Sequence, residues 1–221
     1  MIAGSAMAST FNLGNLLVGI GLIGLGGTFF LPTWSADRVV RVEGRAEALA
    51  RALLAGAAGM EPLDLADPQQ IAKLAADLAL RYQSFGFPES DLPELVAGPP
   101  PTATFQSRHY LLRVVRQPAE AGVDPLADTV RPLAVYAWPR SVLPPGRTVF
   151  FMPADGIAAY SRNLAADYAG LDHAPPPGAA LPADPAEAQH QATYRSRDNE
   201  HWIKLPWAVS EAAAKAEAKP R

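Results

Sequence analysis

The chain contains no cysteine and no charge near its N-terminus. Without cysteine among its 221 residues, it forms no disulfide, no thiolate metal site and no thiol nucleophile. No charged side chain precedes Asp37, and Pro32 is the only one of the 22 prolines before Glu61. Basic residues are not in excess: the chain has 19 Lys and Arg and 22 Asp and Glu, which gives a net charge of −3. This balance argues against a nucleic-acid partner.

The uncharged segment contains one long hydrophobic run. Residues 11–31 read FNLGNLLVGIGLIGLGGTFFL, with Asn12, Asn15 and Thr28 as the only polar side chains. A helix of this length spans the hydrocarbon core of a bilayer, and its glycines allow neighbouring helices to approach closely. The run therefore predicts a transmembrane helix over 11–31, preceded by a leader or short segment over 1–10. Its expected partners are membrane lipid and the membrane helices of other subunits.

Three interpretations of this run are open. A secretory signal would be cleaved near Ser35, although no Lys or Arg precedes the hydrophobic core. A permanent single-pass anchor would retain the run, but the arginines that follow it alternate with acidic residues and do not define an orientation. The third interpretation rests on a family resemblance.

From Thr10 to Leu54 the chain resembles type IV pilins and type II secretion pseudopilins. In that family the mature chain begins with Phe, forms a hydrophobic helix up to a Leu-Pro step, and continues as an amphipathic helix. Phe11, Gly24 and Leu31-Pro32 match this pattern at the family's spacing. The chain departs from it at Thr10, where the leader normally ends in Gly, at Asn15, where the family has Glu, and in lacking a basic leader.

The resemblance implies a structural subunit that assembles by helix packing. Its head would lie on the outer, periplasmic side of the bacterial cytoplasmic (inner) membrane. Asn15 would replace the charged contact that sets the register between subunits. The residues expected in the assembly contact are Phe11, Gly14, Asn15, Gly19, Gly24 and Pro32.

An amphipathic spine helix is expected over 32–59. Pro32 should break or kink the chain, because proline lacks an N–H and clashes with the preceding turn. One apolar stripe then recurs at helical spacing, and Gly59 followed by Pro62 ends it. The stripe consists of Val39, Val42, Ala46, Leu49, Leu53 and Ala57.

Residues 60–163 predict a small head. A helix begins at Asp67-Pro68 with a capping-box Gln70, and its apolar face is Ile71, Leu74, Leu78, Tyr82 and Phe85. A loop or extended connector is expected over 87–104. Strands are expected over 109–116, 133–138, 148–152 and 157–161, the last two joined by a hairpin turn.

With helices mostly before strands, the predicted fold class is α+β: a long N-terminal transmembrane or spine helix packed on a small antiparallel sheet. The head also resembles pilin-like proteins of planctomycete-type bacteria.

The C-terminal region is rich in Pro and Ala. Residues 164–207 predict an extended segment that ends in an apolar island containing Trp202 and Trp207. The island could dock as an edge strand and anchor the tail, or its tryptophans could contact a partner. Residues 208–221 predict a charged tail that is disordered or a frayed helix.

The sequence contains no recognisable catalytic motif. No P-loop, GxSxG or HExxH is present, and the four histidines show no metal-ligand spacing. The acidic clusters lie in expected loops, so calcium is conceivable but no cofactor is predicted. We therefore expect a non-enzymatic, membrane-anchored pilin-like subunit. The alternatives are a single-pass accessory subunit of a larger membrane complex and a secreted binding module.

Overall fold

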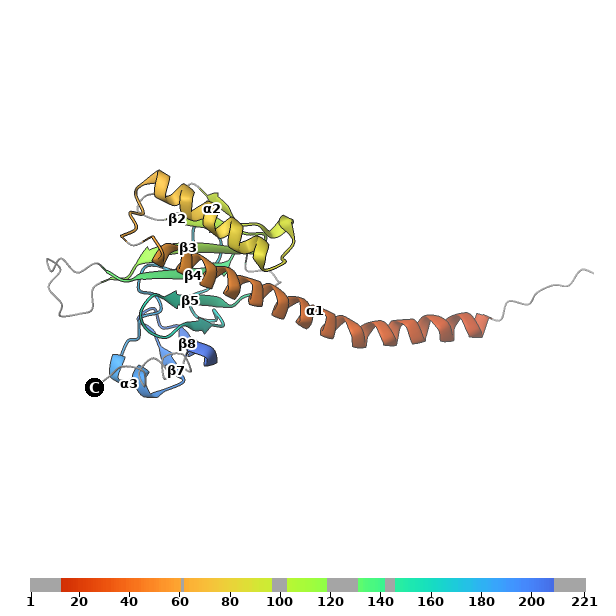
Figure 1. Ribbon diagram of the computed structural model, residues 1–221. Coiled ribbons are helices and arrows are strands. Elements are labelled where there is room, and N and C mark those ends of the chain that lie inside the picture. The colour runs from red at the N-terminus through yellow and green to blue at the C-terminus, as the bar shows by residue number, and fades with distance from the viewer. Residues whose placement is uncertain (1–12, 61, 97–102, 119–130, 142–145, 209–221) are drawn as a thin grey trace, which may run out of the picture.

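A computed structural model describes residues 13–60, 62–96, 103–118, 131–141 and 146–208, with side chains from Ala36 onward except those of Ser90 and Glu187. Figure 1 shows a sheet with helices packed on it and one long helix that extends beyond it. The elements are α1 (Leu13–Ala58), α2 (Pro68–Ser84), η1 (Glu89–Asp91), β1 (Glu94–Val96), β2 (Ala103–Gln106), β3 (Tyr110–Arg116), β4 (Leu133–Pro139), β5 (Val149–Pro153), β6 (Ala159–Ser161), α3 (Pro185–His190), β7 (Thr193–Arg195) and β8 (His201–Lys204).

α1 is a single helix of 46 residues. It continues through Pro32, so the break considered at that residue does not occur. Its C-terminal half packs on the sheet through the predicted stripe, of which all members but the half-buried Val39 are buried. Its N-terminal half extends away from the sheet (Figure 1).

α2 begins as its sequence predicts. The Asp67 side chain caps the helix by accepting a hydrogen bond from the Gln69 N–H at 2.8 Å, and Pro68 is the first helical residue. Gln70 does not complete a capping box with Asp67, because its Oε1 accepts from the Asp64 N–H instead. Phe85 is the C-cap and is 43% exposed, so it does not belong to the buried face.

The described residues form one eight-stranded antiparallel sheet in the order β1-β2-β3-β4-β5-β6-β8-β7. The four predicted strands correspond to β3, β4, β5 and β6. β1 lies within the stretch 87–104 that was expected to be a connector, and β2 begins at the end of that stretch. β8 contains Trp202 and pairs with β6, while β7 occupies the edge beyond it.

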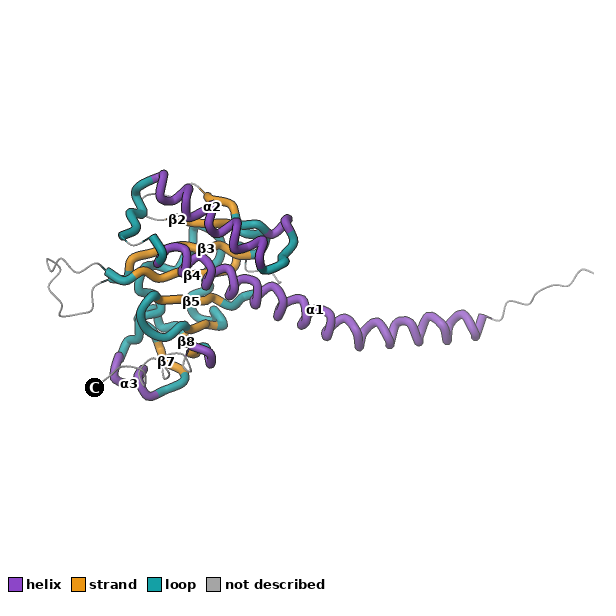
Figure 2. The backbone as a smooth tube through the Cα atoms, in the orientation of Figure 1, coloured by secondary structure: helices purple, strands orange, loops and turns teal. Residues whose placement is uncertain are grey.

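The sheet is covered on both faces. α1 and α2 pack on one face, and residues 164–192 with α3 pack on the other (Figure 2). Because both faces are covered, every residue of the central strand β4 is buried. Leu133, Val135 and Ala137 face the helices, whereas Tyr136 and Trp138 face the C-terminal layer.

The predicted fold class is wrong. The sheet is not small, since the described residues give it eight strands and a second covering layer. Among the described residues, no helix combines the length and apolar composition needed to cross a membrane. The sheet was underestimated because β1, β2, β7 and β8 have only three or four residues each, too few to show a period of two in the sequence.

Candidate functional site: a pocket between α1, α2 and the β2–β3 turn

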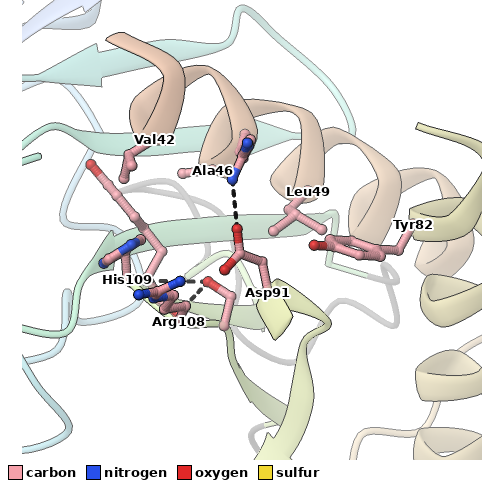
Figure 3. A pocket seen from close by; sticks show the side chains of 10 residues that line it. Val42, Ala46, Leu49, Tyr82, Asp91, Arg108 and His109 are labelled. Carbon is pink, nitrogen blue, oxygen red and sulfur yellow. Dashed lines mark hydrogen bonds and ion pairs between the residues drawn. The ribbon is translucent and has the colours of Figure 1, made fainter. Parts of the chain in front are cut away.

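A solvent-open pocket lies where α1, α2 and the turn between β2 and β3 meet (Figure 3). Its cavity volume is about 20 Å³, which is room for about one water molecule. Aliphatic side chains of α1 form one wall, and polar side chains of η1 and the β2–β3 turn form the other. The lining residues are Val42, Arg45, Ala46, Leu49, Tyr82, Asp91, Ser107, Arg108, His109 and Tyr110.

The central polar contact is an ion pair between α1 and η1. Arg45 Nη1 lies 2.6 Å from Asp91 Oδ2, and the Arg45 guanidinium also lies over the Phe87 ring at 5.6 Å from its centroid. The Asp91 side chain is 10% exposed and that of Arg45 is 34% exposed. Asp91 Oδ1 has no hydrogen-bond partner among the described residues. One oxygen of a buried carboxylate is therefore left as an acceptor inside the pocket.

Two tyrosines of the pocket differ in their hydrogen bonding. The Tyr82 hydroxyl donates to the Pro88 carbonyl at 2.6 Å and so holds the chain that leads into η1. Burial, with the nearby Asp91 carboxylate, raises the pKa of Tyr82 to about 12, although Arg45 opposes the shift. The Tyr110 hydroxyl is buried and, within the described part of the chain, has no partner. Burial raises the pKa of Tyr110 as well, and Glu43 adds to this effect.

His109 lies at the pocket mouth among arginines. Burial lowers the pKa of His109, and the positive charges of Arg108, Arg38 and Arg45 lower it further, against the opposing effect of Asp91. The imidazole is therefore neutral at pH 7. Among the described residues, no hydrogen bond joins His109 to Asp91 or Tyr110, so the pocket holds no preformed acid–base pair.

A second polar cluster lies in the C-terminal layer. The buried Glu200 carboxylate accepts hydrogen bonds from the Ser161 hydroxyl at 2.7 Å and from the N–H groups of Ala165 and Ala166, each at 2.8 Å. Burial favours the neutral form, but these hydrogen bonds outweigh it and lower the pKa of Glu200.

Asp198 completes this cluster. It accepts from the Tyr168 and Ser196 hydroxyls, and Ser196 Oγ in turn accepts from the Trp202 indole N–H at 3.0 Å. The carboxylates of Asp198 and Glu200 thus hold two loops together and leave no open site.

The residues predicted to mediate assembly lie at the far end of α1. Phe11 is outside the described residues. The other five belong to the part of α1 described by its backbone alone: Gly14, Asn15, Gly19, Gly24 and Pro32. None of these five residues lines the pocket, so the pocket and the predicted assembly contact are separate features.

The two tryptophans proposed as partner contacts are held by the chain itself. Trp202 is 0% exposed and packs against Tyr136 and Phe151. Trp207 is half-buried against α1, where its indole N–H donates to Glu47 Oε1 at 2.7 Å. Trp202 therefore leaves no surface for a partner.

Sequence reasoning missed the pocket. The contact between Arg45 and Asp91 joins positions 46 residues apart in the sequence. Nothing in the local pattern of either residue signals that contact.

The described residues contain no group of three or more histidines and carboxylates able to hold a metal ion. No protein-family model matches the chain, and no curated protein and no solved structure matches it significantly.

Proposed function

We propose that the chain is a non-enzymatic structural subunit that assembles with other subunits through the N-terminal half of α1. The observation that carries the proposal is the shape of α1, which continues from the head core to Leu13 and extends well beyond the sheet (Figure 1). From Phe11 to Leu31 the sequence contains no charged side chain. An uncharged run of this length is suited to packing against the helices of other subunits.

The head supports this proposal by fixing α1 firmly. Glu43 Oε1 accepts from the Thr148 hydroxyl at 2.7 Å, and Glu47 Oε1 accepts from the Trp207 indole at 2.7 Å. These contacts attach α1 to the start of β5 and to the end of the described chain. A subunit interaction made by the free half of α1 would therefore position the whole head.

The pilin resemblance is consistent with this role. A location at the bacterial inner membrane, with the head outside the cytoplasm, stays a prediction. This predicted location depends on the uncharged run and not on the head. The pocket offers no reason to prefer an enzyme, because its polar groups include no paired nucleophile and base.

The absence of native cysteine allows a direct test. Gly19→Cys on the free half of α1 should form a disulfide-linked dimer in native membranes or gentle detergent extracts, whereas Ala76→Cys on the exposed side of α2 should not. Gly19→Leu and Gly24→Leu should reduce assembly without changing the thermal unfolding of the head, because bulky side chains keep helices apart.

The products distinguish the alternatives. A homodimer supports self-assembly, whereas a cross-link to a different protein supports an accessory subunit of a larger complex. A chain that gives no Gly19→Cys cross-link and remains monomeric contradicts the proposal. A start at Phe11 in N-terminal sequencing would add pilin-type processing, and a start near Ala36 would favour a secreted module.

A further inference from the structure

The end of the head from which α1 emerges carries a group of exposed arginines, here called the basic face. They come from α1, from the β2–β3 turn, and from the segments that follow β4 and precede β5. The members are Arg38, Arg41, Arg108, Arg140 and Arg147, and all are exposed.

Backbone contacts bring these segments together. The Arg140 N–H donates to the His109 carbonyl at 3.0 Å, and Arg140 Nη1 lies 3.4 Å from the Arg108 carbonyl. The Arg147 N–H lies 3.3 Å from Glu43 Oε1 on α1. The arginines are therefore held at one end of the molecule by the fold itself, although they come from three separate regions of the sequence.

Ion pairing does not tie up the arginines of the basic face within the described chain. None of its five arginines forms an ion pair there, whereas Arg45 beside them is paired with Asp91. The nearby Glu43 carboxylate accepts hydrogen bonds from Thr148 and does not pair with an arginine.

Four exposed carboxylates lie at the same end as the five arginines, and the half-buried Glu43 lies among them. Asp37 on α1 and Glu89 on η1 lie on the helix side, and Asp167 and Asp172 belong to a loop on the opposite side of the sheet. The undescribed residues 142–145 add no charge, because they read VLPP.

We infer that the basic face binds the anionic headgroups of a phospholipid bilayer and holds the head against the membrane surface. Guanidinium groups suit phosphate, because their planar donors can contact two oxygens at once. The direction of α1 selects a bilayer over other polyanions, since the uncharged run leaves the head through this same end (Figure 1). A phospholipid bilayer can accommodate both the arginines and the uncharged run, because its headgroup layer is anionic and its interior is apolar.

The inference rests on the membrane location proposed above and adds how the head is oriented there. A basic residue near an anionic bilayer strengthens binding about fivefold. Removal of two arginines should therefore weaken the docking of the head about 30-fold, even where the hydrophobic run keeps the chain on the vesicle.

The test uses the full-length chain with an environment-sensitive dye on a single introduced cysteine. Ser141→Cys places the dye beside Arg140, and Ala154→Cys places it in the β5–β6 turn at the other end of the sheet. The chain is mixed with vesicles of phosphatidylcholine alone or with added phosphatidylglycerol. The dye at position 141 should report contact only on the anionic vesicles and lose it at high salt, and the dye at 154 should not respond.

A matched pair of charge reversals makes the test specific. Arg108→Glu with Arg147→Glu should lower the docking equilibrium about 30-fold or more, whereas Lys73→Glu with Arg131→Glu changes the net charge equally and should leave it unchanged. If the first pair unfolds the head, Arg38→Gln with Arg41→Gln on the exposed side of α1 replaces it. Thermal unfolding of each variant is measured in parallel.

The outcomes separate the two proposals. Headgroup docking would be overturned if the dye gave equal signals on both vesicle types or if the two pairs of charge reversals had equal effects. It would also be overturned if inorganic phosphate without vesicles changed the dye signal in the same way. A chain that floats with neither vesicle type would overturn the membrane location itself.

Discussion

Trp207 closes the fold onto its first helix, because its indole Nε1 donates to Glu47 Oε1 at 2.7 Å across 160 residues of sequence. The Arg51 guanidinium lies over the same ring, 4.2 Å from its centroid. The segment that follows β8 is thereby attached to α1 on the helix face of the sheet.

This contact can be divided into its parts by mutation. Trp207→Phe keeps an aromatic ring under Arg51 but removes the indole donor, so we expect it to lower the free energy of unfolding by about 1 kcal/mol. Trp207→Ala also removes the cation–π contact and the packing, and should cost about 2–3 kcal/mol. Urea denaturation measures both changes.

A double-mutant cycle with Glu47→Ala supplies the control. The hydrogen bond predicts that Trp207→Phe has almost no further effect once Glu47 is replaced. Additive losses from the two substitutions would show that the contact contributes nothing to stability.

The two pocket tyrosines predict opposite responses to loss of their hydroxyls. Tyr82→Phe removes the hydrogen bond to the Pro88 carbonyl and leaves that acceptor without its donor, so it should destabilise the head by about 1 kcal/mol. Tyr110→Phe removes a buried hydroxyl with no partner among the described residues, so it should be neutral or slightly stabilising. Thermal unfolding of the two variants under one condition compares them directly.

A clear loss of stability in Tyr110→Phe would contradict the unpartnered state of its hydroxyl. Such a loss would mean that a water molecule or ligand forms a hydrogen bond with the Tyr110 hydroxyl in solution.

Much of the helical face of this head could be predicted from the sequence. The stripe on α1 and the capped start of α2 depend on the spacing of residues that are close together in the sequence, so they can be recognised without knowing the tertiary fold. β4 was also predictable, because a run such as LAVYAW is typical of a strand buried on both faces.

The C-terminal layer could not be predicted in the same way. Its buried anchors, among them Tyr168, Ala180 and Tyr194, are separated by prolines and polar residues and show no period. They become a core only against the outer face of β4 and β5. The basic face and the Arg45–Asp91 pair were missed for the same reason, since each is assembled from segments that only the tertiary fold brings together.

Two glycines of α1 offer a comparison within one helix. A Cβ at Gly44 would meet no atom within 4 Å, so Gly44→Ala should stabilise the protein by up to about 1 kcal/mol through helix propensity. A Cβ at Gly56 would lie 2.6 Å from Asp77 Oδ2 and 3.1 Å from Leu74 Cδ1. We expect Gly56→Ala to destabilise by about 1 kcal/mol, because the Asp77 and Leu74 side chains must move to admit the methyl group.

Chemical denaturation of the two alanine variants decides this prediction. Equal stabilisation by both would show that Asp77 and Leu74 move aside easily and that the contact between α1 and α2 is loose at Gly56.

Glu200 predicts a specific dependence of stability on pH. Its pKa is lower in the folded protein than the value of about 4.3 for an unfolded chain, because the N–H groups of Ala165 and Ala166 and the Ser161 hydroxyl favour the carboxylate. A depressed pKa means that the unfolded state binds the proton more readily. The stabilisation is therefore complete above the unfolded pKa and is lost as the pH falls through the folded pKa.

Glu200→Gln should remove this contribution and cost about 2–3 kcal/mol at pH 7, because a neutral amide accepts these hydrogen bonds more weakly and adds donors that have no acceptor. The difference in unfolding free energy between the two proteins should then shrink below about pH 4. Glu89→Gln is the matched control, since Glu89 is exposed and its replacement should have little effect at either pH. A Glu200→Gln penalty that stays constant from neutral to acid pH would show that the buried group acts through its shape and not through its charge.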